Sequence, residues 1–137
     1  MVEFDDIGPE KILEVYNPKI GMHGYLVIDS TALGVSKGGI RLTPTVNMDE
    51  VARLARAMSY KNALAGLPFG GAKAGIMVDP KTITSQKKKA IIESFANSLR
   101  PLIPSHYIAG PDINTTEKEM EQFARAHGLW ESATGKP

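Results

Sequence analysis

The chain has 137 residues, 42% of them hydrophobic, and its 16 basic and 15 acidic residues leave a formal net charge of +1. The length fits a single globular domain, and the near-neutral charge excludes the large basic field that would attract nucleic acid or a membrane surface. The chain has no cysteine, which excludes disulfides, thiolate metal sites and a cysteine nucleophile, and which fits an expected cytoplasmic location.

The first elements that the sequence predicts form a hairpin. Residues 11–16 are rich in β-forming side chains, residues 17–21 carry turn signals, and the apolar run 25–28 reads as a second strand. A glycine-rich loop is expected at 34–39, followed by a short strand at 40–42.

A long helix is predicted at 48–65. Asn47 is a good N-cap, and Glu50 three residues later would complete a capping box. Arg53 and Arg56 fall on the face that we expect to meet water. Four apolar residues at helical spacing form the face that we expect to be buried: Val51, Leu54, Ala55 and Met58.

The helix should end at the Gly-Leu-Pro of residues 66–68. The sequence then predicts a tight glycine-rich loop at 69–75 and, at 76–78, an apolar run typical of a strand buried on both faces. A second helix is predicted at 86–99, and a short strand at 107–109.

A third helix is predicted to start at Thr116, with Glu119 as its capping-box partner and Gly128 as its end. Strands that alternate with helices indicate an α/β fold. We therefore expect three α/β/α layers around a mostly parallel sheet that carries a short N-terminal hairpin.

Three charged residues are candidates for chemistry, although each has an ordinary alternative. Lys37 could be a solvated loop lysine. Lys61 could be a helix lysine whose stem lies along apolar neighbours. Asp112, after the last predicted strand, could be a turn aspartate.

Lys73 is a stronger candidate, because glycines at 70, 71 and 75 would let a ligand approach the backbone closely. A plain tight turn is the alternative. The segment lacks the Gly-Lys-Ser/Thr of a phosphate-binding loop, and no Gly-x-Gly-x-x-Gly occurs in the chain. The three histidines have no metal-ligand spacing, so we expect no metal site.

Several short motifs occur together in one order. They are Lys-Gly-Gly-x-Arg at 37–41, Met-x-Tyr-Lys at 58–61, Gly-Gly-Ala-Lys at 70–73, Asp-Pro at 79–80, Ala-Gly-Pro-Asp at 109–112 and Thr-Gly-Lys-Pro at 134–137. From about residue 10 onwards, the chain thereby resembles the N-terminal, substrate-binding and oligomerisation domain of the glutamate/leucine/phenylalanine/valine dehydrogenase family.

The resemblance implies a role for each motif. Lys73 would activate water and assist proton transfers, and Asp112 would carry protons to and from the amino group. Lys61 would bind the α-carboxylate of the substrate, and Lys37 its side-chain carboxylate. The other residues that the resemblance places at the substrate are Gly38, Gly39, Met58, Gly70 and Gly71.

The resemblance also implies an NAD- or NADP-dependent oxidative deamination of L-glutamate to 2-oxoglutarate and ammonia. The cofactor would be bound mainly by a Rossmann domain outside this chain, so the chain alone should be inactive and should assemble into a homo-oligomer. Ala74, where glutamate dehydrogenases commonly have glycine, and the short hairpin keep a leucine-type substrate open. A non-catalytic small-acid-binding or assembly module is the other alternative.

Overall fold

The elements that the sequence predicts are all present in the computed structural model, which describes residues 1–137. The strands are β1 (Lys11–Asn17), β2 (Met22–Ser30), β3 (Ser36–Thr43), β4 (Gly70–Met77) and β5 (Tyr107–Pro111). The α-helices are α1 (Met48–Leu64), α2 (Ser85–Ser98) and α3 (Glu117–Arg125), and short 3-10 turns are η1 (Pro80–Thr82), η2 (Arg100–Leu102) and η3 (Trp130–Ser132).

The five strands form one sheet in the order β1-β2-β4-β3-β5. The expected hairpin is confirmed, since β1 pairs antiparallel with β2. β2 also pairs antiparallel with β4, whereas β3 pairs in parallel with both β4 and β5. The α/β fold is therefore confirmed, but the sheet is evenly mixed where we expected mostly parallel pairing, because the hairpin continues directly into the sheet.

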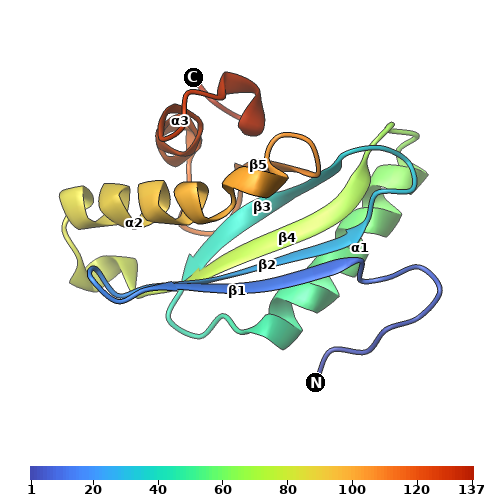
Figure 1. Ribbon diagram of the computed structural model, residues 1–137, viewed down its shortest axis with the longest axis horizontal. Helices are drawn as coiled ribbons and strands as arrows, with labels where there is room; N and C mark the ends of the chain where they lie inside the picture. The colour runs from blue at the N-terminus through green and yellow to red at the C-terminus, as the bar shows by residue number, and fades with distance from the viewer.

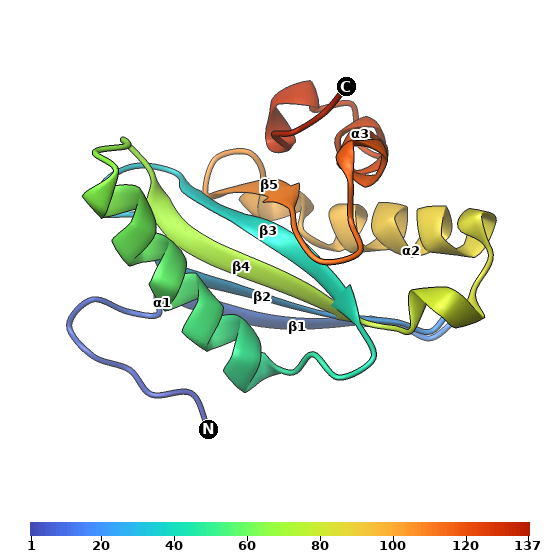
Figure 2. The ribbon, with the colours of Figure 1, turned by 180° about the vertical axis from the view of Figure 1, so that it is seen from behind.

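The helices lie on both faces of the sheet, which gives the expected three layers (Figures 1 and 2). α1 packs across β2 and β4 on one face, and α2 and α3 cover the other. None of these helices combines the length and the apolar character that crossing a bilayer requires.

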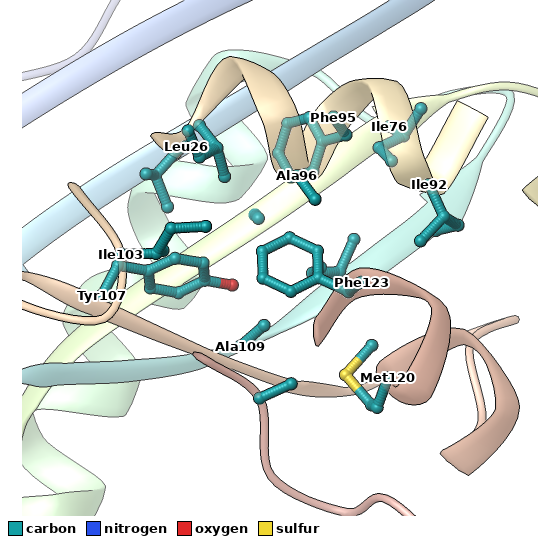
Figure 3. Close-up of a cluster of buried hydrophobic side chains, with 14 of the residues drawn as sticks. Leu26, Ile76, Ile92, Phe95, Ala96, Ile103, Tyr107, Ala109, Met120 and Phe123 are labelled. Carbon is teal, nitrogen blue, oxygen red and sulfur yellow. The ribbon is translucent and has the colours of Figure 1, made fainter. Parts of the chain in front are cut away.

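The main core lies between the sheet and the α2/α3 layer and contains 20 buried hydrophobic residues (Figure 3). Phe95 of α2, Tyr107 of β5 and Phe123 of α3 are its largest side chains, and all three are fully buried. Each such side chain contributes about 2 kcal/mol through removal from water. The inner face of α2 and its C-cap consists of four residues without solvent exposure: Ile92, Phe95, Ala96 and Leu99.

The two predicted glycine-rich loops are wrong, because both segments are strands. β3 begins at Ser36, so Lys37 to Gly39 are strand residues, and β4 begins at Gly70. Glycine usually weakens a strand, but it also lets another backbone come close. In this domain the glycines of β3 and β4 allow such close contacts with β5 and α1.

The helix caps are partly as predicted. Asn47 caps α1 by accepting a hydrogen bond from the Glu50 amide at 2.9 Å. The other half of the predicted capping box is absent, because the Glu50 carboxylate lies 3.4 Å from the guanidinium of Arg41. The capping box of α3, between Thr116 and Glu119, is confirmed.

Arg56 does not face water as predicted. Its Nε donates to the buried carboxylate of Asp29 on β2 at 2.8 Å, and its two terminal nitrogens donate to Asp5 at 2.8 and 2.9 Å. Ser59 donates a further hydrogen bond to Asp29 at 2.7 Å. Arg56 thereby fastens the N-terminal segment to α1 and to the sheet.

Candidate functional site

The candidate site lies on the part of the sheet that α1 leaves uncovered. α1 packs on β2 and β4 and contacts β3 only at its margin. Along β3, Ile40 and Leu42 belong to the main core, so the alternation of a strand places Lys37, Gly39 and Arg41 on the opposite, α1-side face.

Lys73 and Asp112 meet on this face. Lys73 stands in β4 between two core alanines, so its side chain leaves the sheet on the α1 side, where it is only 8% exposed. Asp112 directly follows β5 and is 20% exposed. Lys73 Nζ lies 3.2 Å from Asp112 Oδ1. The structure therefore brings together the two residues to which the resemblance assigns catalysis.

Arg41 is a member of this group that our reading of the sequence missed. Its Nε donates a 2.7 Å hydrogen bond to Asp112 Oδ2, and its terminal nitrogen lies 3.4 Å from Glu50 on α1. The signal was present, because Arg41 closes the Lys-Gly-Gly-x-Arg motif. Because residues 34–39 were expected to form a loop, the alternation that places Lys37, Gly39 and Arg41 on one face of β3 was not seen.

These contacts hold Asp112 as a carboxylate. Burial by itself would raise the pKa of Asp112, but the hydrogen bond from Arg41 and the positive charge of Lys73 outweigh it, so the pKa lies below its ordinary value. The same hydrogen bond raises the pKa of the Arg41 guanidinium.

Gly39 makes room for the aspartate. A Cβ at this position would lie 2.8 Å from the Asp112 Cβ and 2.7 Å from the carbonyl oxygen of Pro111. The neighbouring Gly38 accepts a 2.8 Å hydrogen bond from the buried hydroxyl of Tyr107 through its carbonyl oxygen. Gly39 therefore lets β3 and Asp112 come together, whereas a Cβ on Gly38 would collide with the carbonyl oxygen of Ala72 on β4.

Gly70 and Gly71 are required by packing within the domain. A Cβ on Gly71 would lie 2.1 Å from the Ser59 nitrogen of α1, and one on Gly70 would lie 1.8 Å from the Ser30 carbonyl oxygen. α1 thus sits directly on the start of β4, two residues before Lys73. These contacts within the domain explain why both positions are glycine. Space for a substrate, which we expected from the sequence, is not required to explain them.

Lys37 is a half-buried cation without an acidic partner. Its Nζ lies 3.8 Å from the centre of the Phe69 ring, a cation–π contact. Burial, together with the charge of Lys136, lowers the pKa of Lys37. A half-buried ammonium group without a carboxylate partner favours a bound anion.

Lys61 does not reach the other candidates. It lies in the last turn of α1, where its side chain is exposed and makes no ion pair. Met58, one turn earlier, is half-buried. Lys73 and Asp112 therefore contact each other, Lys37 shares their face of the sheet but contacts Phe69 instead, and Lys61 does not join them.

The site is an open face rather than an enclosed pocket. Three hollows of about 530, 520 and 530 Å³ lie elsewhere on the molecule, and no candidate residue lines them. No cluster of histidine and acidic side chains has the arrangement of a metal site. What the face offers is a nearly buried lysine paired with an aspartate, which can exchange protons with a bound molecule.

Comparisons with known proteins agree with this geometry. The family described as Glu/Leu/Phe/Val dehydrogenase, dimerisation domain, matches residues 9–127. The glutamate dehydrogenase of Thermotoga maritima is 37% identical over 121 residues, which make up 83% of this chain and 29% of that protein. Other relatives are named NADP-specific and NAD-specific glutamate dehydrogenases.

Solved structures give the same answer. The hetero-hexameric glutamate dehydrogenase from Thermus thermophilus, in a Leu-bound form, matches with a TM-score of 0.89 and 33% identity, over 94% of this chain and 34% of that one. The L-tryptophan dehydrogenase from Nostoc punctiforme matches with a TM-score of 0.79 and 25% identity, over 93% of this chain and 37% of that one. The chain therefore belongs to the Glu/Leu/Phe/Val dehydrogenase family, and it corresponds to the dimerisation domain of that family.

Proposed function

We propose that this domain binds L-glutamate and supplies the proton-transfer groups for its NAD(P)-dependent oxidative deamination to 2-oxoglutarate and ammonia. One observation carries the proposal: Lys73 and Asp112, which are distant in sequence, lie 3.2 Å apart on the same face as the unpaired cation Lys37. The glutamate dehydrogenases among the relatives support it.

Asp112 and Lys73 would each carry out a different proton transfer. Asp112 would accept a proton from the substrate amino group, and Lys73 would take one from the water molecule that replaces nitrogen at Cα. Their contact lets one proton pass to the departing amine. The carbinolamine hydroxyl gives up its proton as the carbonyl forms, ammonia takes up one proton, and the remaining proton goes to solvent, so that both residues end as they began. A positioned acid or base of this kind contributes about a hundredfold to ten-thousandfold in rate.

A nicotinamide cofactor supplies the hydride acceptor in this chemistry. The residues of this chain do not fit its binding, because no strand leads through a Gly-x-Gly-x-x-Gly turn into a helix. We therefore assign to this chain only substrate binding and proton transfer. The open face of the site is consistent with a second wall from another domain.

Lys37 favours a dicarboxylate as substrate. It lacks a carboxylate partner in the domain, and the charge of Lys136 adds to the positive potential around it. A neutral side chain would leave Lys37 uncompensated, whereas the distal carboxylate of glutamate would pair with it.

The substrate proposal is tested in an enzyme that contains this domain together with its cofactor domain. Lys37→Met should lower kcat/KM for glutamate about a hundredfold while changing kcat/KM for the neutral analogue norvaline much less. Lys89→Met, on the exposed side of α2, is the matched control. Equal losses for both substrates would contradict the assignment of Lys37.

Assembly is a second candidate function, favoured by the description of the matching family as a dimerisation domain. We propose that the chain forms homo-oligomers. Light scattering would measure their mass, and calorimetry would measure glutamate binding by the same sample. Stable oligomers with no affinity for any amino acid would favour an assembly module over the catalytic domain.

A further inference from the structure

The carboxylate of Asp112 is held differently at its two oxygens. Oδ2 accepts the short 2.7 Å hydrogen bond from Arg41 Nε, whereas Oδ1 lies 3.2 Å from Lys73 Nζ. The backbone is fixed as well, because the Asp112 amide donates to Thr115 Oγ1 at 2.9 Å, and that hydroxyl donates to the Ile40 carbonyl oxygen at 2.8 Å. Asp112 therefore has little freedom to rotate.

Arg41 is itself braced from a second element. Its side chain is 19% exposed, and Glu50 in the first turn of α1 lies 3.4 Å from its terminal nitrogen. Its Nε–H can point at only one acceptor, since the guanidinium is planar and its donors have a fixed geometry. These two contacts fix the orientation of the guanidinium plane, because Asp112 binds Nε and Glu50 of α1 lies at a terminal nitrogen.

We infer that Arg41 is a positioning residue: by holding Oδ2 of Asp112, it leaves Oδ1 as the one carboxylate oxygen that faces Lys73 and exchanges protons. The inference rests on the proposed function for its catalytic meaning, but the positioning itself is a property of this domain. Arg41 does not touch the reacting atoms in this assignment, and it acts through Asp112.

The charged groups around Asp112 are few enough to state the expected titration. Arg41 on β3 and Lys73 on β4 contact it directly, Glu50 on α1 acts through Arg41, and Tyr107 on β5 is buried nearby with a pKa that burial and the Asp112 charge raise. Removing the guanidinium therefore removes the strongest hydrogen bond to the carboxylate and leaves Lys73 and the Ile113 amide to stabilise its charge.

The experiment follows the Asp112 carboxyl carbon by NMR during a pH titration of this chain. In Arg41→Gln the titration midpoint should rise by about one pH unit or more. Arg41→Lys, which retains charge but lacks the directed Nε–H, should rise less. Glu50→Gln, which keeps the hydrogen bond from Arg41, is the control and should leave the Asp112 midpoint almost unchanged.

A complete dehydrogenase that contains these substitutions provides the second readout. Arg41→Gln should lower kcat at least tenfold and move the acidic limb of the kcat profile upward in pH, while KM for glutamate changes little, because Arg41 does not bind the substrate. If the role of Arg41 were purely structural, its substitution would lower the melting temperature. The Asp112 titration midpoint and the pH of the acidic limb would then stay unchanged.

The possible results separate the two proposals. An unchanged Asp112 midpoint in folded Arg41→Gln, or in Arg41→Lys if the first variant does not fold, would overturn the positioning role. Shifted midpoints in a domain whose complete enzyme does not oxidise glutamate would refute the proposed function and leave the positioning of Asp112 standing.

Discussion

Two aspartates of this domain are held by arginines in nearly the same way. Asp29 on β2 accepts from Arg56 Nε at 2.8 Å, and Asp112 after β5 accepts from Arg41 Nε at 2.7 Å. Both carboxylates lie on the α1 side of the sheet, and each has one further donor, Ser59 for Asp29 and Lys73 for Asp112.

Their surroundings differ in access to solvent. The Asp29 side chain is 1% exposed, beneath α1 and the N-terminal segment that Arg56 fastens, whereas the Asp112 side chain is 20% exposed on a face that α1 leaves open. Ion-pair geometry alone therefore does not distinguish a carboxylate that holds the fold from one that can meet a ligand. The open face and the neighbouring unpaired Lys37 make that distinction.

The largest expected effect is on activity. In a complete dehydrogenase, Asp112→Asn should lower kcat about a thousandfold, because the amide cannot accept a proton, and should lower the melting temperature less than Asp29→Ala does. Steady-state kinetics and calorimetry on one preparation would check both statements. Turnover close to that of the unaltered enzyme would show that Asp112, like Asp29, has only a structural role and that the open face is not catalytic.

The reverse pattern is expected for the other aspartate. Asp29→Ala should lower the free energy of unfolding by about 2 to 3 kcal/mol, because Ser59 and part of Arg56 lose a buried acceptor. Denaturant titration would measure this loss. Activity per folded molecule should stay near its original value, and a large loss of kcat at full folding would contradict the division of roles.

The pH dependence of stability sharpens the comparison further. The pKa of Asp112 is lowered in the folded state, so its contacts stabilise the fold above the ordinary aspartate pKa of about 3.9, and that contribution disappears as the pH falls through the folded-state pKa. The stability difference between the unaltered domain and Asp112→Asn should accordingly be constant near neutral pH and shrink below about pH 4. Chemical denaturation across that range would test the sign.

The smallest expected effect concerns Asp5, which Arg56 holds at the surface. Hydrogen bonds from Arg56 and from the amides of Gly8 and Ile7 keep the pKa of Asp5 far below its usual range. Asp5→Ala should speed hydrogen exchange at those two amides without a measurable change in melting temperature, since exposed pairs contribute little. Glu3→Ala is the matched control, and unchanged exchange in Asp5→Ala would show that Arg56 does not order this segment.

Local signals in the sequence predicted most of the fold. The hairpin, the N-cap Asn47 and the capping box at Thr116 depend on neighbouring residues, so they could be read from short segments. The strands that begin at Ser36 and Gly70 could not, because their glycines are required by contacts with β5 and α1 that are remote in sequence. Tertiary packing overrides the usual preference of glycine for loops.

The site was predictable to a similar degree. The motifs supplied Lys73 and Asp112, and the structure brings them together, but Arg41 could not be recognised without its contact to Asp112, which is remote in sequence. Arg56 was misplaced for a related reason: an arginine opposite an apolar stripe normally meets water, and its two acidic partners come from outside the helix. Ion pairs between distant segments leave no periodic trace in a sequence.

The alternation along β3 has a consequence for how the chain folds. Ile40 and Leu42 point into the core while Lys37 and Arg41 point out of it, and a shift of this strand by one residue would exchange the two sets. The shifted arrangement would bury two cations among apolar side chains, at a cost of several kcal/mol each. The charges proposed for substrate recognition thus also discourage misaligned pairing of the central strands, so replacing them with apolar residues should yield a chain that folds less uniquely.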